Sequence, residues 1–354
     1  MTRRITLLCK IVDNLGDAGV SLRFARLWVK RFEQDEVCIW TDDITPFVSL
    51  LYGEPPSTRI SDLGTLNVCE GRLKIRHQPH PETLSDWGDV VIEAFGTPLP
   101  DQWKTELSQR VPRPFWINLE YLSAEDWVED CHGKTSTDPK TGWQQLFFFP
   151  GFTEKTGGLL GLESTEKPIK KIYNPMFSNK IFVFCYEHAP IEVLLKQTRD
   201  LGLKTEIATK HFQEGWRALD ASKFDFVAQE DFDAALIAFR WLFVRGEDSF
   251  VRAQLAGVPM VWQIYPTGDG AHWAKLSAFF AKYSEGLRQE AKQALWNLWQ
   301  FWNEDKPTQE DRDLLEIAMR FEPELMENAL RWQHKIKQHC HLIDRLGAFL
   351  PPRN

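Results

Sequence analysis

The sequence has few cysteines, and their spacing is not that of a disulfide-rich or zinc-binding protein. Six cysteines are spread over 354 residues without a C-x-x-C pair, and Cys9 and Cys185 lie inside apolar runs. Buried cysteines without paired spacing are typical of proteins from a reducing compartment. We therefore expect thiols rather than a disulfide framework.

Long apolar runs and a targeting segment are also missing. No stretch approaches the roughly 20 apolar residues that are needed to cross a bilayer. The basic start at residues 1–4 is followed by a short apolar run that Lys10 interrupts, without the cleavage site of a signal peptide. These absences predict a cytoplasmic protein that does not associate with membranes.

Positive charge is in deficit. The chain has 42 Lys and Arg against 50 Asp and Glu, a formal net charge of -8, which argues against a broad nucleic-acid-binding surface. Aromatic residues are abundant, with 15 Trp and 24 Phe, and most of them are expected in packed cores. The length and the 43% hydrophobic content predict about two globular domains.

Short apolar runs alternate with helical patterns in the first half of the chain. After a run at 5–12, apolar residues recur from Leu22 to Phe32 at helical spacing. Near-continuous apolar runs between helices are typical of a parallel sheet that helices cover on both faces. We expect further strands at 37–41, 73–77, 89–95, 114–121 and 145–149.

A second series of the same kind follows a charged, proline-containing stretch, and its strands are expected at 180–186, 204–209, 224–228, 241–245 and 259–264. We predict an α/β protein of two doubly wound Rossmann-type domains facing a central cleft, with ligands at the carboxyl ends of the strands. The expected parts are a domain at 1–165, a linker at 166–179, a domain at 180–330 and a last helix at 331–354 that crosses back to the first domain.

The stretch at 245–257 has the pattern of a strand end, a polar turn and a helix. Ser249 or Asp248 is expected to cap the helix, and Gly257 to end it. The amino end of such a helix suits a phosphate or pyrophosphate, because its N–H groups are unpaired and carry partial positive charge. A capped helix without a ligand is the other interpretation.

The loop at 13–19 follows the first expected strand, but it lacks the G-x-G-x-x-G fingerprint of dinucleotide-binding proteins. Asp13 and Asp17 would repel a pyrophosphate, and they suit instead a cation or an acceptor whose proton must be removed. The alternative is that Asp13 or Asp17 only caps a helix that begins near Ser21.

Metal-binding patterns are weak. Asp231 and Asp233 have D-x-D spacing, but they open an apolar helical pattern where acids usually cap the helix. The histidines lack metal-site spacing, so we expect no bound metal. Two further stretches come at expected strand ends: 118–125, which should face the cleft, and 151–158, a glycine-rich loop without the spacing of a P-loop lysine.

Taken in order, these stretches resemble one family, the bacterial protein-arginine rhamnosyltransferases that modify translation elongation factor P (the EarP family). The resemblance runs in the family's order over most of the chain and is most specific at 13–21 and 245–257. The linker, 130–141 and the C-terminal helices match poorly. The matching stretches are 10–21, 40–43, 118–125, 151–159, 229–233, 245–257 and 265–266.

The resemblance implies a GT-B glycosyltransferase that moves L-rhamnose, with inversion, from dTDP-β-L-rhamnose to a guanidinium nitrogen of an arginine on elongation factor P, without metal or other cofactor. It implies that Asp17 is the catalytic base or the acid that orients the nucleophile, that Asp13 is its neighbour in the acceptor pocket, and that Glu247 assists. The donor-binding residues that it implies are Phe184, Tyr186, Gln229 and Phe232 around the nucleotide and sugar, and Arg245, Glu247, Asp248 and Ser249 along the pyrophosphate and sugar.

The chemistry of these residues fits that reaction. A guanidinium has a pKa above about 12 and is a poor nucleophile. Asp13 and Asp17 would bind this group, orient it and accept a proton from it. Arg245 and the helix N–H groups would stabilise the leaving diphosphate, and Phe184 and Phe232 would stack on thymine. Two alternatives stay open: another GT-B nucleotide-sugar enzyme, with a small-molecule acceptor or as an epimerase, and a non-catalytic translation-associated binding protein.

Overall fold

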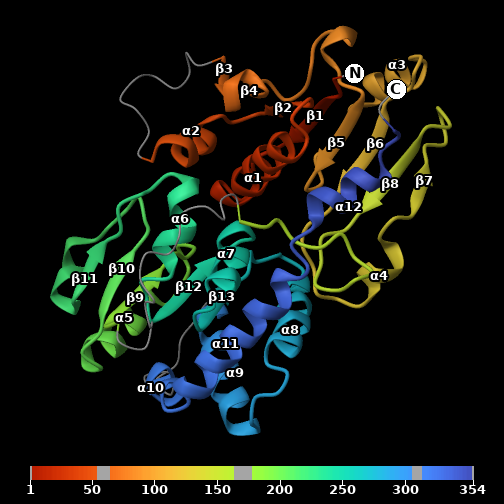
Figure 1. The fold of residues 1–354 in the computed structure, drawn as a ribbon. Coiled ribbons are helices and arrows are strands. Elements are labelled where there is room, and N and C mark those ends of the chain that lie inside the picture. Colours follow the sequence, from red (N-terminus) through yellow and green to blue (C-terminus); the bar gives the residue numbers. More distant parts are fainter. Residues whose placement is uncertain (1, 54–63, 163–177, 305–312, 353–354) are drawn as a thin grey trace. The chain divides into compact units, whose positions relative to one another are not determined.

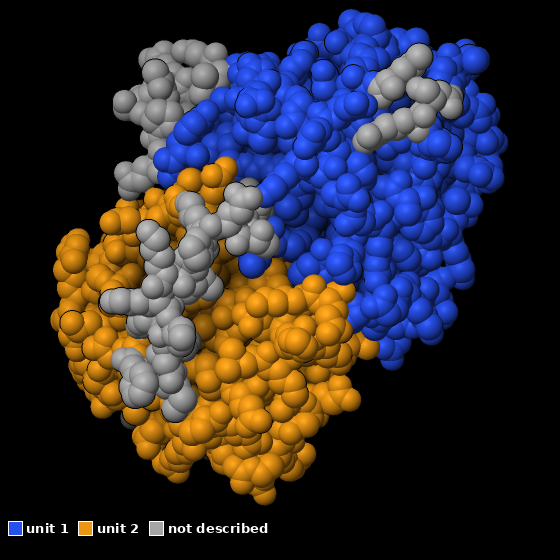
Figure 2. Space-filling model, in the orientation of Figure 1, with its two compact units in different colours: residues 1–163, 339–354 blue, residues 164–338 orange. Residues whose placement is uncertain are grey.

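The chain forms two compact units, which Figure 2 shows in different colours. A computed structural model describes residues 2–53, 64–162, 178–304 and 313–352. Unit 1 comprises Met1–Glu163 and His339–Asn354, and unit 2 comprises Ser164–Gln338. The linker expected at 166–179 lies almost wholly outside the described residues.

Unit 1 is built on an eight-stranded sheet in the order β3-β4-β2-β1-β5-β6-β8-β7. The six inner strands are parallel, as expected, while the edge strands β3 and β7 pair antiparallel with their neighbours. Both edge strands are short and were not predicted. The strands are β1 (Arg4–Cys9), β2 (Glu36–Thr41), β3 (Thr65–Val68), β4 (Leu73–His77), β5 (Val90–Ala94), β6 (Phe115–Leu119), β7 (Thr135–Thr137) and β8 (Gln144–Phe148).

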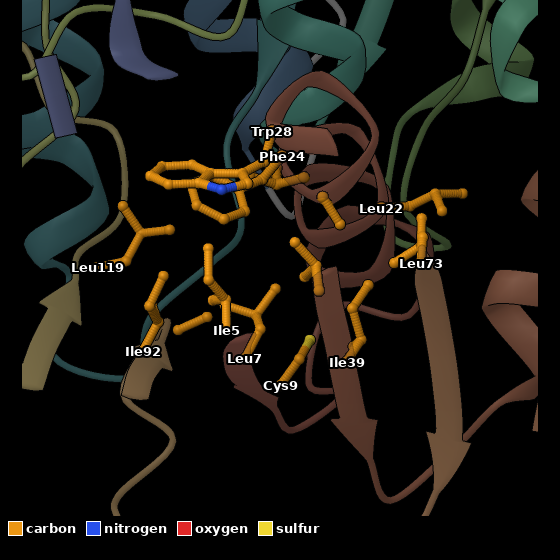
Figure 3. Close-up of a cluster of buried hydrophobic side chains, with 14 of the residues drawn as sticks. Ile5, Leu7, Cys9, Leu22, Phe24, Trp28, Ile39, Leu73, Ile92 and Leu119 are labelled. Atoms are coloured by element: carbon orange, nitrogen blue, oxygen red, sulfur yellow. The ribbon is translucent and has the colours of Figure 1, made fainter. Parts of the chain in front are cut away.

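Helices cover the two faces of this sheet unequally. Alternate side chains of each strand point to opposite faces, so Ile5, Leu7 and Cys9 of β1 pack under Phe24 and Trp28 of α1 (Figure 3). A second, smaller core on the other face holds buried tryptophans, among them Trp40, Trp87, Trp103 and Trp116. The helices of unit 1 are α1 (Leu15–Arg31), α2 (Thr45–Tyr52), α3 (Asp101–Ser108), α4 (Trp127–Cys131) and α12 (Leu342–Phe349).

Unit 2 has a fully parallel sheet of five strands in the order β11-β10-β9-β12-β13 (Figure 1). Its strands are β9 (Lys180–Val183), β10 (Lys204–Ile207), β11 (Ala221–Lys223), β12 (Trp241–Arg245) and β13 (Met260–Gln263). Its helices are α5 (Ile191–Asp200), α6 (Gln229–Leu236), α7 (Asp248–Ala256), α8 (Ala271–Tyr283), α9 (Gln289–Asn303), α10 (Leu314–Met319) and α11 (Glu322–Lys337).

Two expectations about unit 2 are wrong in detail. The strand expected at 224–228 is instead β11, which begins three residues earlier, because residues after Lys223 leave the sheet and Phe224 packs edge-on against Phe182. The boundary expected at residue 330 falls inside α11, whose buried Leu325, Ala329, Trp332 and Ile336 recur at helical spacing on either side of it. The last helix is α12, which packs in the core of unit 1.

The excess of aromatic residues goes largely into these cores. In unit 2, Phe279 lies 6.0 Å from Trp299 and 5.6 Å from Trp332, measured between ring centroids. None of the six cysteines, all within the described ranges, forms a disulfide. No helix of the described residues combines the length and the apolar character that crossing a membrane requires.

Candidate functional site

In unit 1, polar side chains gather where β1 ends and α1 begins. Asp17 lies in the first turn of α1 and only 3% of it is exposed. One of its carboxylate oxygens accepts hydrogen bonds from the N–H groups of Val12 and Asp13, both at 2.8 Å. The Tyr121 hydroxyl, which follows β6, also hydrogen-bonds this carboxylate. Asp17 thus ties the loop to the helix.

The capping interpretation of Asp13 and Asp17 is wrong for this helix. The helix α1 begins at Leu15, six residues before Ser21, and Asn14 occupies the N-cap position without a side-chain capping bond. The Asp17 carboxylate binds N–H groups of the loop before the helix rather than those of the helix itself. Ser21 lies inside α1, where its hydroxyl donates to the Cys9 sulfur at 3.1 Å.

Burial sets the proton affinity of Asp17. Desolvation raises the pKa of its carboxyl above the usual value, and the negative charge of Asp42 raises it further. Hydrogen bonds from Asp13, Val12 and Tyr121 act in the opposite direction but do not cancel the rise. A carboxylate with a raised pKa is a stronger base, so Asp17 is suited to accept a proton.

Asp13 lies against a glycine that leaves it room. A Cβ added to Gly16 would come within 2.3 Å of an Asp13 carboxylate oxygen, and the Gly16 N–H donates to the Asp13 carbonyl at 2.6 Å. Only glycine therefore allows the Asp13 side chain this position. Asp13 is half-buried, whereas Asp17 is buried, so the two carboxylates differ in their access to solvent.

Loops after three neighbouring strands hold this region in place. Asp42, after β2, accepts the Ile11 N–H at 2.9 Å, and the Thr97 hydroxyl, after β5, accepts the Lys10 N–H at 2.9 Å. The Tyr121 ring lies 5.0 Å from that of Phe95. Sequence reasoning assigned no role to Asp42 or Thr97, although both follow a strand end and that position could have identified them. Asp13 and Asp17 after β1, with Asp42 after the neighbouring β2, form an acidic cluster that suits a cation.

In unit 2, the expected strand, turn and helix are present at 245–257. The strand β12 ends at Arg245, α7 begins at Asp248, and Gly257 ends α7 in the left-handed conformation with φ of 69°. Capping by Ser249 or Asp248 is wrong, because α7 has no side-chain cap. Instead the buried Ser249 hydroxyl donates to the Arg245 carbonyl at 2.5 Å and fastens the turn. Glu247 is the half-buried residue just before α7.

Arg245 lies between two aromatic rings. Its guanidinium carbon is 4.5 Å from the ring centroid of Phe184 and 4.3 Å from that of Tyr186. These contacts hold a cation beside the amino end of α7, and the desolvated rings strengthen the interaction. The structure therefore brings together three of the expected donor-binding residues.

A buried glutamine that the sequence did not reveal positions Tyr186. The Gln263 side chain accepts the Tyr186 N–H at 2.7 Å, and its amide nitrogen lies 3.2 Å from His188. Gln263 has no measurable exposure, and it ends β13, the strand next to β12. Only the position at a strand end pointed to it, because its contacts join residues far apart in the sequence.

The remaining expected donor residues lie around α6 and α7. Gln229 is buried at the start of α6 and its amide donates to Asp248 at 3.3 Å. Phe232 packs on Phe182 with ring centroids 5.8 Å apart, while Phe184 contacts Phe226 at 6.5 Å. Stacking of a base between Phe184 and Phe232 stays a prediction.

The D-x-D stretch lies beside a buried cation. Asp233 is 3.9 Å and Asp248 is 3.8 Å from the guanidinium of Arg252, which is 2% exposed. Sequence reasoning missed Arg252, which looks like an ordinary helix residue. Within the described ranges no three His, Cys, Asp or Glu side chains group as a metal site requires. The expectation of no metal stays a prediction.

The glycine-rich loop at 151–158 is held in unit 1 by contacts with α12. Arg345 of α12 donates to the carbonyls of Thr153 and Thr156 and to the Glu154 carboxylate. A Cβ on Gly157 would lie 2.3 Å from the Phe148 ring. The loop is therefore packed and hydrogen-bonded within unit 1.

Comparison with known proteins places this geometry in a family. Residues 5–351 match the family described as Elongation-Factor P (EF-P) rhamnosyltransferase EarP. A protein-arginine rhamnosyltransferase of Pseudomonas putida is 35% identical over 361 aligned positions, which cover 92% of this chain and 93% of that protein.

Solved structures agree on the fold. One solved structure matches with a TM-score of 0.56 at 24% identity over 98% of both chains. It is described as the structural basis for EarP-mediated arginine glycosylation of translation elongation factor EF-P. The glycosyltransferase VinC, in complex with dTDP, matches with a TM-score of 0.54 at 14% identity over 98% of both chains. At such identities the structures establish the fold alone, which is that of GT-B glycosyltransferases. Because the family match extends from β1 to the end of α12, this chain is a glycosyltransferase that belongs to the EarP family of elongation factor P rhamnosyltransferases.

Proposed function

We propose that this protein transfers L-rhamnose from dTDP-β-L-rhamnose to a guanidinium nitrogen of an arginine on translation elongation factor P, with inversion at the anomeric carbon. Membership of the EarP family makes it a protein-arginine rhamnosyltransferase. Among the observations on this chain's own residues, the buried Asp17 with its raised pKa carries the proposal furthest. An acceptor that is a translation factor also implies that the protein works in the cytoplasm.

The acidic cluster of unit 1 supports an arginine as acceptor. Asp13 and Asp17 offer carboxylates to a planar cation, and Asp42 adds negative charge at the same strand ends. Because carboxylates pair with guanidinium in a fixed plane, they would orient one nitrogen toward the sugar. This acidic cluster would repel the phosphates of a nucleotide, so it favours binding of the acceptor rather than of the donor.

The strand end in unit 2 supports a nucleotide sugar as donor. Arg245 offers a fixed positive charge, and the N–H groups at the start of α7 add partial positive charge beside it. Together they would stabilise the negative charge that develops on a leaving diphosphate. Fixed positive groups of this kind take the place of a metal ion, so the transfer is proposed to need none.

The step itself balances without a cofactor. A guanidinium nitrogen forms a bond to the anomeric carbon while the bond from that carbon to the diphosphate oxygen breaks, and the electron pair leaves with dTDP. The proton lost by the nitrogen goes to Asp17, and Glu247 assists from the donor side. Attack on the face opposite the leaving group produces the inversion.

A direct assay tests the proposal. The protein is incubated with dTDP-β-L-rhamnose and elongation factor P, and intact mass spectrometry is expected to show one added deoxyhexose on the acceptor, with equimolar release of dTDP. A panel of sugar nucleotides is the control, and preference for a uridine donor or for a small-molecule acceptor would favour another GT-B enzyme. Binding of dTDP without any turnover would indicate a non-catalytic binding protein.

A further inference from the structure

The sheet of unit 1 has a cavity on the face opposite α1. The cavity has a volume of about 170 Å³ and is lined by residues of β1, β2 and β4 together with the segment at 86–88. Register places Trp40 of β2 beside Arg76 of β4, and Cys38 beside Lys74. The side chains of these four residues therefore share the face that α1 does not cover.

The lining of the cavity is basic in a chain that is acidic. Four cations, Arg4, Arg72, Lys74 and Arg76, line it together with two acids, Glu36 and Asp86. The local balance is positive, although the whole chain has a formal net charge of -8. No ion pair joins any of the four cations to a carboxylate of the described residues.

Two of these cations already have structural partners. Arg72 donates to the carbonyl oxygens of Val29 and Glu33 at the end of α1. Arg4 donates to the carbonyl oxygens of Ser85 and Trp87. Arg76 hydrogen-bonds the neutral Cys38 side chain, and Lys74 and Arg76 are the lining cations without a backbone carbonyl partner among the described residues, so they are the ones available to a ligand.

Two buried donors beside these cations lack an acceptor. The indole nitrogen of Trp40, a residue that is 2% exposed, and the Nε atom of Arg76 have no hydrogen-bond partner among the described residues. The guanidinium of Arg76 lies 4.9 Å above the Trp40 ring, so the two donors are neighbours. Buried donors without acceptors cost free energy, so polar groups beside the two cations are left unsatisfied.

Cys38 does not supply the missing negative charge. Burial raises the pKa of its thiol to about 12, even with Arg76 and Lys74 nearby. The sulfur is therefore neutral at physiological pH and adds no negative charge beside Lys74 and Arg76.

We propose that this cavity binds a phosphate-type oxyanion, either free phosphate or the terminal phosphate of a small phosphorylated molecule, with Lys74 and Arg76 as its charged ligands. A doubly charged tetrahedral anion matches the two cations Lys74 and Arg76, whereas a carboxylate brings one charge. The volume of about 170 Å³ suits a compact anion rather than an extended nucleic acid.

Calorimetric titration with inorganic phosphate tests this directly, with excess dTDP present to occupy the donor site of unit 2. The wild-type protein is expected to bind one phosphate, and Lys74→Met to weaken the binding about tenfold or more, since a charge-assisted hydrogen bond is lost. Arg76→Lys keeps the charge and should weaken the binding less than Arg76→Met. Lys204→Met, at an exposed position of β10 in unit 2, is the control and should bind as the wild type.

Glycerol phosphate in a parallel titration distinguishes the two sources: tighter binding than phosphate assigns the site to phosphate esters, and equal or weaker binding assigns it to free phosphate. Thermal unfolding verifies that each variant is folded. The proposal is overturned if millimolar phosphate gives no heat with the wild type, or if Lys74→Met binds phosphate as tightly. It is also wrong if phosphate does not bind while Lys74→Met raises KM for the protein acceptor, because the cavity would then contact an acidic protein surface.

Discussion

Replacing Asp17 by Asn separates its chemical role from its structural role. The carboxylate oxygen that accepts the Val12 and Asp13 N–H groups at 2.8 Å has a counterpart in the Asn carbonyl oxygen, so the loop can keep both bonds. The amide cannot take a proton. Because a positioned general base contributes about 10²- to 10⁴-fold to a rate, we expect kcat to fall by that factor while dTDP still binds.

The stability of the variant should move little, and the sign follows from the pKa. Burial raises the pKa of Asp17 in the folded state, so the folded protein binds a proton more tightly than the unfolded chain. Stability is then lost as pH rises from the unfolded pKa through the folded one, so at pH 7 the buried Asp17 carboxyl is a cost relative to a neutral side chain. The amide removes this cost and weakens two hydrogen bonds by about 1 kcal/mol in total, so the free energy of unfolding should stay within about 1 kcal/mol of the wild type.

Rates of dTDP release between pH 4 and 9 and urea unfolding at pH 7 provide the two measurements. The wild-type rate should rise with pH through the raised pKa of Asp17, and the variant should lack this limb. Asp43→Asn is the matched control, since Asp43 also follows a strand and its carboxylate also accepts a backbone N–H, that of Thr45 at 2.8 Å, but it is half-buried rather than buried. Unchanged turnover in Asp17→Asn would remove Asp17 from the mechanism, and unfolding of the variant would make its role structural.

Three further predictions concern unit 2. Arg245→Met should weaken dTDP binding about ten- to hundredfold in calorimetry, because the cation between Phe184 and Tyr186 is lost; unchanged affinity would contradict its role. Glu322→Ala should lower the free energy of unfolding by about 2 kcal/mol without changing donor affinity, since the buried Glu322 accepts hydrogen bonds from Arg240 and Trp241. Gly257→Ala should lower the free energy of unfolding in urea by about 2 kcal/mol, and Gly202→Ala by about 1 kcal/mol. Both glycines have φ of 69°, but only at Gly257 would the new Cβ meet another side chain, that of Gln333 at 2.9 Å. Equal losses would refute this difference.

The parts of the fold that follow local patterns could be predicted from the sequence. Inner strands such as β5 and β12 appear within one residue of the expected ranges because their largely apolar runs are buried on both faces. The edge strands β3 and β7 were missed, since their largely exposed residues leave no apolar run. The start of α1 was placed six residues late, because polar Asp17 enters the helix only by virtue of its bonds to the preceding loop.

The candidate site divides in the same way. Asp17, Arg245 and Ser249 lie at strand ends and in helix starts, where their positions could be inferred from the order of elements. Gln263 and Arg252 could not be found in this way. The partner of Gln263, Tyr186, lies 77 residues away, and Asp233, which approaches Arg252, belongs to the separate helix α6. Contacts between segments distant in sequence leave no local signal.

The return of α12 to unit 1 has a consequence for the order in which the chain can fold during synthesis. Leu342, Ile343 and Leu346 of α12 complete the core on the α1 side of the sheet, although more than a hundred residues of unit 2 are translated before them. Unit 2 is continuous in sequence and precedes α12 in the chain. The sheet of unit 1 therefore keeps an uncovered apolar patch until α12 has been translated, and in that interval the exposed patch favours aggregation of the nascent chain.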